Sequence, residues 1–148
     1  MRLLNDFDFY VKIGIVKKQL PDRLRAASLI NETNDSYLSL IDFFKKIGVT
    51  DRNANHFVKN AYDVIMGLIR AKMILEGYNS SGKGAHEAEV AYFKKLGFND
   101  NEVEFINQLR YFRNGIMYYG KRFDEDYVKK VLNFLEKVVP KLKRLIII

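Results

Sequence analysis

An arginine and an asparagine stand side by side in residues 109–120, which read LRYFRNGIMYYG. Arg113 carries a permanent positive charge that suits phosphate, and Asn114 offers both a hydrogen-bond donor and an acceptor. Tyr118 follows Asn114 by four residues and Arg110 precedes Arg113 by three, so a helix places these side chains in a polar row. This spacing predicts a polar row beside the apolar face of the helix.

Arg113 also interrupts an apolar stripe. At about 100° per residue, a helix gathers the following side chains into one arc with Arg113 near its middle: Phe105, Ile106, Leu109, Phe112, Ile116 and Met117. A charge there is rarely buried unpaired, so Arg113 meets a carboxylate, lines a cleft or lies at a subunit seam. The alternative is a snorkelling arginine on an ordinary amphipathic helix. Gly115 costs about 1 kcal/mol relative to alanine, which favours close approach of another backbone or a ligand.

A glycine-rich segment elsewhere comes close to a phosphate-binding loop. It reads Gly77-x4-Gly82-Lys83-Gly84, one residue away from the P-loop pattern. That pattern needs Ser or Thr where Gly84 stands. It also needs a strand before the first glycine, where this sequence predicts a helix. We therefore expect no nucleotide triphosphate hydrolysis, and at most a phosphate contact from Lys83.

Metal and thiol chemistry find no support in the sequence. The two histidines, His56 and His86, fall on different expected helices without a second histidine at a metal-binding spacing, so a hydrogen-bonded structural role is the default for both. Acidic residues are expected on solvated helix faces, with no carboxylate pair for acid/base work. The chain has no cysteine, which excludes disulfides, thiolate zinc sites and cysteine nucleophiles. We expect neither a metal nor a cofactor.

Composition sets wider limits. The 148 residues, 48% hydrophobic and 29% charged, match a single globular domain spanning 1–148. The net charge of +7 favours a polyanionic partner modestly, because lysine-rich surfaces also serve solubility. No stretch approaches the ~20 apolar residues of a membrane span, and the start lacks a signal-like apolar run. We expect a cytoplasmic protein that does not bind membranes, and a tail at 145–148 that packs against a neighbour or partner.

The elements that position these residues are all predicted to be helices, because apolar residues recur at helical spacing with Gly and Pro between the segments. The expected helices span residues 4–20, 21–47, 51–76, 85–96, 100–119 and 124–144. Pro21 ends the first, the polar run 31–35 is a possible interruption of the second, and Pro140 is expected to kink or shorten the last. Thr50 or Asp51 caps the third helix, and residues 78–84 form the most flexible loop. Strands find little support.

In order and spacing, several of these segments resemble the HEPN domains, small helical bundles that are widespread in prokaryotes. The resemblance covers residues 24–139 and rests on Asn60-Ala61-Tyr62, Ala71, Glu76-Gly77, Gly84-Ala85-His86-Glu87 and, above all, residues 109–120. It implies an antiparallel up-and-down bundle of about five to six helices. It also implies a homodimer in which the Arg-Asn elements of both subunits face a shared cleft.

The resemblance implies a choice of activities. Active members carry Arg-x4-6-His, which looks like a metal-independent ribonuclease site, whereas others bind RNA or nucleotides, often beside a small nucleotidyltransferase in toxin-antitoxin pairs. Arg113 and Asn114 match that motif, but Tyr118 or Tyr119 stands where the histidine belongs. Tyrosine, with an ordinary pKa of about 10, is a poor general base near neutral pH, although it can donate a proton or stack on a base.

We therefore expect a HEPN-like homodimer that binds RNA or a nucleotide and has weak or no nuclease activity. The cleft is expected to contain Arg110, Arg113, Asn114 and Tyr118, where Arg113, Asn114 and Tyr118 are the catalytic candidates. Nucleic-acid contacts are expected from Arg110, Arg113, Tyr119 and Lys121. The alternatives are an active metal-independent endoribonuclease toxin and a non-catalytic dimerising scaffold.

Overall fold

The computed structural model describes residues 4–146, apart from the side chains of Met117 and Tyr118. Within this range the chain forms six helices and two short strands. In chain order they are α1 (Phe7–Lys12), β1 (Val16–Lys18), α2 (Arg23–Lys46), α3 (Ala54–Glu76), β2 (Tyr78–Ser80), α4 (Ala85–Lys95), α5 (Asp100–Tyr119) and α6 (Glu125–Leu145).

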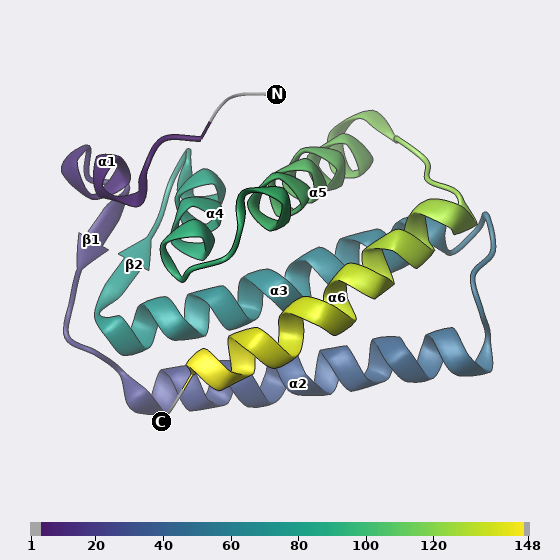
Figure 1. The fold of residues 1–148 in the computed structure, drawn as a ribbon, viewed down its shortest axis with the longest axis horizontal. Helices are drawn as coiled ribbons and strands as arrows, with labels where there is room; N and C mark the ends of the chain where they lie inside the picture. Colours follow the sequence, from purple (N-terminus) through teal and green to yellow (C-terminus); the bar gives the residue numbers. More distant parts are fainter. Residues whose placement is uncertain (1–3, 147–148) are drawn as a thin grey trace.

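The long helices form an antiparallel bundle around α3. Figure 1 shows α2 and α5 running in one direction and α3 and α6 in the other. Helix α3 packs against α2, α4, α5 and α6, and most of its residues are buried. It approaches α2 so closely that a methyl group at Gly67 would overlap the Thr33 hydroxyl. The predicted all-α bundle is confirmed.

Most helix ends lie where local signals place them. Gly77 and Gly120 end α3 and α5 with φ of 83° and 65°, values that glycine adopts without strain. Asn99 and Glu102 form a capping box at the start of α5, which begins at Asp100 as predicted. Helix α3 instead begins at Ala54, three residues or so later than predicted.

The start of α3 is delayed by a turn. The Thr50 backbone N–H donates to the Asn53 side chain at 2.8 Å, and the Asn53 N–H donates to the Thr50 hydroxyl at 3.3 Å. Thr50 and Asn53 therefore bond to each other, and Asn53 becomes the residue that precedes the helix. The polar residues 31–35 do not interrupt α2, which is continuous to Lys46.

The first predicted helix is wrong over much of its length. Helix α1 ends at Lys12 because Gly14 takes a left-handed conformation with φ of 81°. Strand β1 follows and pairs antiparallel with β2, with Val16 opposite Ser80. The Val16 side chain is buried in the core, which fixes this pairing. Part of the loop predicted at 78–84 is therefore a strand.

Pro140 does not end the last helix early, because α6 continues to Leu145. Proline removes one N–H and leaves the carbonyl of residue i−4, here Glu136, without its helical partner. Both Pro140 and Glu136 are exposed, so water can bond that carbonyl. Val139 and Leu142 on the opposite side are buried and hold the helix against the core.

The C-terminal segment contacts the chain's own core through Ile146. The remaining residues of the predicted packed tail, Ile147 and Ile148, lie outside the described residues. Among residues 4–146, no helix combines the length and the apolar character needed to cross a bilayer.

Candidate functional site

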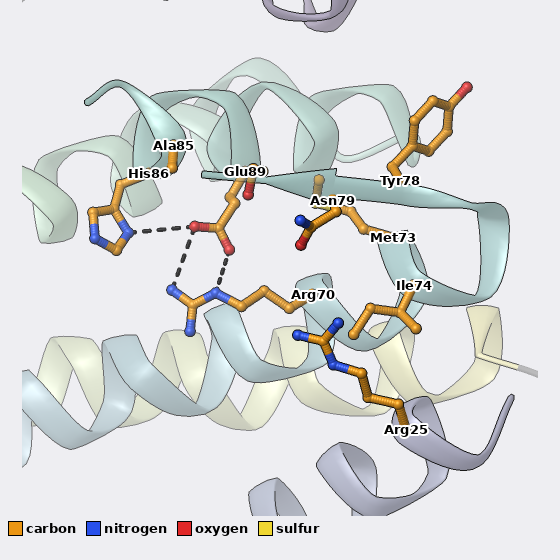
Figure 2. A pocket seen from close by; sticks show the side chains of 10 residues that line it. Arg25, Arg70, Met73, Ile74, Tyr78, Asn79, Ala85, His86 and Glu89 are labelled. Atoms are coloured by element: carbon orange, nitrogen blue, oxygen red, sulfur yellow. Dashed lines mark hydrogen bonds and ion pairs between the residues drawn. The ribbon is translucent and has the colours of Figure 1, made fainter. Parts of the chain in front are cut away.

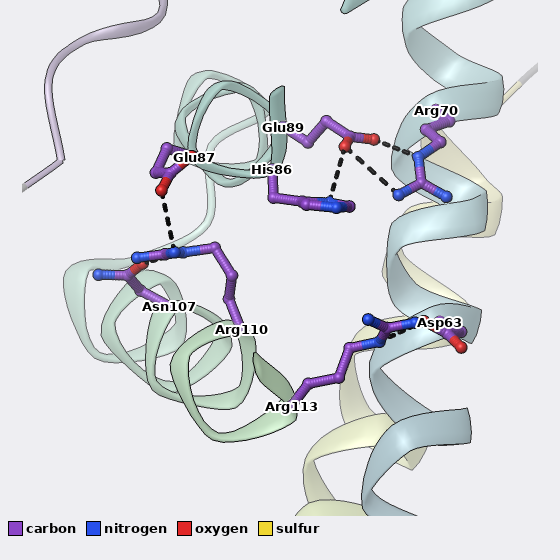
Figure 3. Close-up of polar contacts among 8 residues, drawn as sticks. All are labelled: Asp63, Arg70, His86, Glu87, Glu89, Asn107, Arg110 and Arg113. Atoms are coloured by element: carbon purple, nitrogen blue, oxygen red, sulfur yellow. Dashed lines mark hydrogen bonds and ion pairs between the residues drawn. The ribbon is translucent and has the colours of Figure 1, made fainter. Parts of the chain in front are cut away.

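A row of charged side chains lies between α3 on one side and α4 and α5 on the other. Figure 3 shows Arg113 reaching Asp63 on α3, and Arg70, two turns further along α3, reaching Glu89 on α4. Arg70 follows Asp63 by seven positions, a rise of about 10 Å along the helix. We call Asp63, Arg70, His86, Glu89 and Arg113, with the Tyr62 hydroxyl, the charged row.

Arg113 is half-buried and meets a carboxylate, one of the alternatives that its position in the apolar stripe allowed. Its Nε donates to Asp63 Oδ1 at 3.0 Å, and its side chain is 26% exposed. The guanidinium carbon lies 5.8 Å from the centre of the Tyr62 ring, a cation–π distance. Within the described residues only the Nε–H of Arg113 is engaged, so its other N–H groups are available to a ligand.

Glu89 occupies the other end of the charged row and is almost fully buried, with 2% of its side chain exposed. The Nε and Nη2 of Arg70 both donate to its carboxylate, the latter at 3.3 Å. His86 Nδ1 lies 3.3 Å from Glu89 Oε1. Burial lowers the pKa of Arg70, but the charge and hydrogen bonds of Glu89 raise it by more, so Arg70 stays charged.

The Tyr62 hydroxyl is a buried polar group without a hydrogen-bond partner among the described residues. Burial raises the pKa of Tyr62, the charge of Glu89 raises it further, and the charges of Arg110, Arg70 and Arg113 lower it. The net shift of the pKa is upward, so the hydroxyl is a neutral donor, and its ring lies beside the Arg113 guanidinium. A buried donor normally has an acceptor, and an anion bound to Arg113 would supply one.

Arg110 does not belong to the charged row, which corrects the prediction that it lines a cleft. Its side chain is only 7% exposed, and its Nη1 lies 3.1 Å from Glu87 Oε1. Its Nε donates to Asn107 Oδ1 at 2.9 Å (Figure 3). These bonds within the chain satisfy Arg110, so we assign it to fixing α4 against α5.

The other predicted contacts spread over the end of α5. Asn114 is half-buried, and Tyr119 is 88% exposed. The Lys121 ammonium lies 4.4 Å from the centre of the Phe112 ring. Tyr118 belongs to α5, but its side chain is outside the described residues.

Gly115 has a different neighbour from the one predicted. A Cβ at this position would meet Lys121 Cδ at 3.5 Å and Lys121 Cβ at 3.6 Å, which are ordinary contacts. The backbone N–H of Lys121 also donates to the Gly115 carbonyl at 3.3 Å. The close neighbour is thus the turn that follows α5.

Acidic residues are not confined to solvated faces, which is a second correction. Both Glu89 and Glu102 are buried, and each lies near cations: Glu102 Oε2 is 3.6 Å from the Lys141 ammonium.

The two histidines also differ. His56 Nδ1 lies within hydrogen-bond distance of Asn60 Nδ2, at 3.2 Å, as expected of a structural histidine. His86 instead belongs to the charged row.

Sequence reasoning missed Tyr62, Asp63, Arg70, His86 and Glu89 as parts of one site. A signal was present for two of them, since Arg70 and Glu89 each interrupt an apolar run, at 64–71 and 88–93. In the part of the chain that the structure describes, no cluster of three or more His, Cys, Asp or Glu side chains is arranged to hold a metal ion.

Comparisons of the chain with protein-family models, with curated proteins and with solved structures found no match.

Proposed function

We propose that this chain is a HEPN-like homodimer that binds RNA or a nucleotide through the charged row, with weak or no nuclease activity. The observation that carries the proposal is the buried Tyr62 hydroxyl, which has no acceptor among the described residues, while the Arg113 guanidinium carbon lies 5.8 Å from the centre of the same ring. A phosphate oxygen can accept a hydrogen bond from this hydroxyl, and its negative charge is attracted by the arginine.

The two arginines of the row are each paired with a carboxylate, so phosphate binding depends on opening the exposed pair of Arg113 and Asp63. Asp63 is half-exposed and engages one N–H of Arg113, so the pair can open toward solvent at little cost. Arg113 then offers the bidentate geometry that suits phosphate oxygens. The ring of Tyr119, near the end of α5, is exposed and adds a surface on which a base can stack.

We propose two partners, a second copy of the chain and a small nucleotidyltransferase, because the sequence resembles the HEPN domains. A second copy of the chain would bring its own Arg113 and Asn114 to a shared cleft. A small nucleotidyltransferase would be the further partner in a toxin-antitoxin pair.

An active metal-independent endoribonuclease is the second candidate function, and His86 favours it. The imidazole is half-exposed, and its Nδ1 faces Glu89, which leaves Nε2 for a substrate. The histidine that the α5 motif lacks would then come from α4. EDTA-resistant cleavage of RNA that His86→Gln abolishes would establish this candidate.

Arg113→Ala is expected to weaken binding of a single-stranded RNA oligonucleotide about tenfold, because a charged hydrogen bond contributes roughly 1.5–3 kcal/mol. The salt dependence of binding should become shallower, since one phosphate contact is lost. Stability should change by less than about 1 kcal/mol, because the ion pair with Asp63 is partly exposed. Fluorescence anisotropy at several salt concentrations and urea unfolding measure the two effects.

Two matched variants sharpen this test. Arg144→Ala removes an exposed arginine in the last turn of α6, which is not part of the charged row, and should leave binding unchanged. Tyr62→Phe should weaken binding without loss of stability, because it deletes a hydroxyl that has no partner in the described part of the chain. A large loss of stability with unchanged binding in Arg113→Ala would assign Arg113 to structure and refute the proposed site.

Self-association is expected to persist at low micromolar concentration. Light scattering should return twice the 17.3 kDa of the chain, because the shared cleft requires two copies. A mass of one chain at that concentration would remove the shared-cleft model.

A further inference from the structure

A pocket of about 250 Å³ lies beyond the Arg70 end of the charged row. It forms where the first turn of α2, the last turns of α3, strand β2 and the start of α4 meet (Figure 2). Its polar walls include Arg25, Arg70, Asn79 and Ser80, and its apolar wall includes Met73 and Ile74. No residue predicted from the Arg-Asn motif contributes to it.

Hydrogen-bond donors converge on this pocket without protein acceptors. Figure 2 shows the Arg25 guanidinium and the Asn79 amide on opposite sides of the space between α2 and β2, and the amide supplies both a donor and an acceptor. Neither side chain bonds another described residue. Arg70 uses Nε and Nη2 on Glu89, which leaves its Nη1 as a third donor.

The charge of the pocket is positive. Its carboxylate, Glu89, is already paired with Arg70 and contacts His86, so the charge of Arg25 is uncompensated in the pocket. Asp22, three residues before Arg25, directs its carboxylate to the Arg25 backbone N–H at 3.0 Å as the cap of α2. Lys17 is opposite Asn79 in the β1–β2 pairing and therefore shares its face of the ribbon.

The strand pair holds these donors in place. The Gln19 N–H donates to the Gly77 carbonyl at 2.9 Å, and a Cβ at Gly77 would lie only 2.6 Å from the Gln19 carbonyl oxygen. Glycine is therefore required at the point where α3 passes into β2. Because β2 is paired with β1 along its length and follows α3 directly, Asn79 lies on a hydrogen-bonded strand rather than in a loop.

We infer that this pocket binds a phosphomonoester. The phosphate oxygens accept from Arg25, Asn79 and the Nη1 of Arg70, while a base or another apolar group lies on Met73 and Ile74, which are buried beneath it. A mononucleotide and the 5′-phosphate end of an RNA strand share this chemistry. The second source rests on the proposed RNA binding, whereas the first does not.

Calorimetry with AMP, adenosine and inorganic phosphate tests the pocket on the full chain. AMP is expected to bind at least tenfold more tightly than adenosine, and inorganic phosphate should compete with it. Arg25→Gln should weaken AMP binding about tenfold, through loss of a charged hydrogen bond. Arg23→Gln is the matched control, since Arg23 is exposed two residues away and does not line the pocket, and it should bind AMP like the wild type.

Short RNAs with a 5′-phosphate or a 5′-hydroxyl separate the two sources. A preference for the 5′-phosphate that Arg25→Gln removes, without AMP binding, identifies an RNA end as the ligand and supports the inference. AMP binding that depends on Arg25 without RNA binding supports it as well, while refuting RNA binding through the charged row. If Arg25→Gln affects neither AMP nor the preference for a 5′-phosphate, the pocket is not a phosphomonoester site.

Discussion

Arg70→Met is expected to lower the free energy of unfolding by about 2–3 kcal/mol. The substitution leaves the Glu89 carboxylate, 2% exposed, with His86 as its remaining partner in the charged row. Removing one partner of a fully buried pair typically costs 3–5 kcal/mol, and we expect less here because the Arg70 side chain is 41% exposed. Urea unfolding followed by circular dichroism measures the change.

The double variant Arg70→Met with Glu89→Leu should recover part of this loss, because it leaves no buried charge. Arg23→Met serves as the control for removing an arginine from an exposed position. If Arg70→Met were as stable as the wild type, Glu89 would not depend on the guanidinium, and the Arg70 end of the row would not be held as we describe.

The helix of the Arg-Asn motif was predictable because its signals are local. Asn99 with Glu102 marks the start of α5 and Gly120 marks its end, and both act through bonds within a few residues. The position of Arg113 in the apolar stripe indicated a partner. The identity of that partner, Asp63, was not predictable, since it lies 50 residues earlier and only packing of α3 against α5 brings it near.

Glu89 was missed for a related reason. A single sequence offers charge and spacing, and these placed the acidic residues of α4 on a solvated face. The helix is instead buried continuously from Ala88 to Phe93 because α1, α3, α5 and β2 surround it. A glutamate in such a run is a signal of a buried ion pair, but its partner Arg70 is known only once α3 and α4 are packed together.

The error in residues 4–20 also has a non-local cause. Apolar residues there fit a helical period, and Pro21 provided a plausible end. Gly14 breaks the helix, and β1 gains its hydrogen bonds from β2. Helices α2 and α3 lie between these two strands in the sequence. A short strand whose partner is distant has little local signature, because its stability comes from the pairing and from the buried Val16.

Tyr118→His is expected to raise EDTA-resistant cleavage of RNA by about 100-fold over the wild type. If the charged row binds RNA as proposed, the reaction lacks a group on α5 that takes the 2′-hydroxyl proton, and histidine, with an ordinary pKa of about 6.5, can do so. General acid/base catalysis typically contributes 10²- to 10⁴-fold, and we take the lower value. Position 118 is five residues after Arg113, about 140° around the helix, so a productive site requires the second subunit or a distorted helix end. Gel assays of a labelled oligonucleotide, with the metal-free protein, measure the rate.

Tyr119→His is the positional control, because Tyr119 is 88% exposed and a histidine there should raise cleavage less. His86→Gln added to Tyr118→His should preserve the gain, since the new imidazole on α5 replaces any contribution from α4. A gain that disappears in this double variant would place the base on His86 and favour the endoribonuclease. Robust cleavage by the wild type in EDTA, abolished by Arg113→Ala, would overturn the binding function in favour of the enzyme, because the tyrosines of α5 would then not limit the reaction.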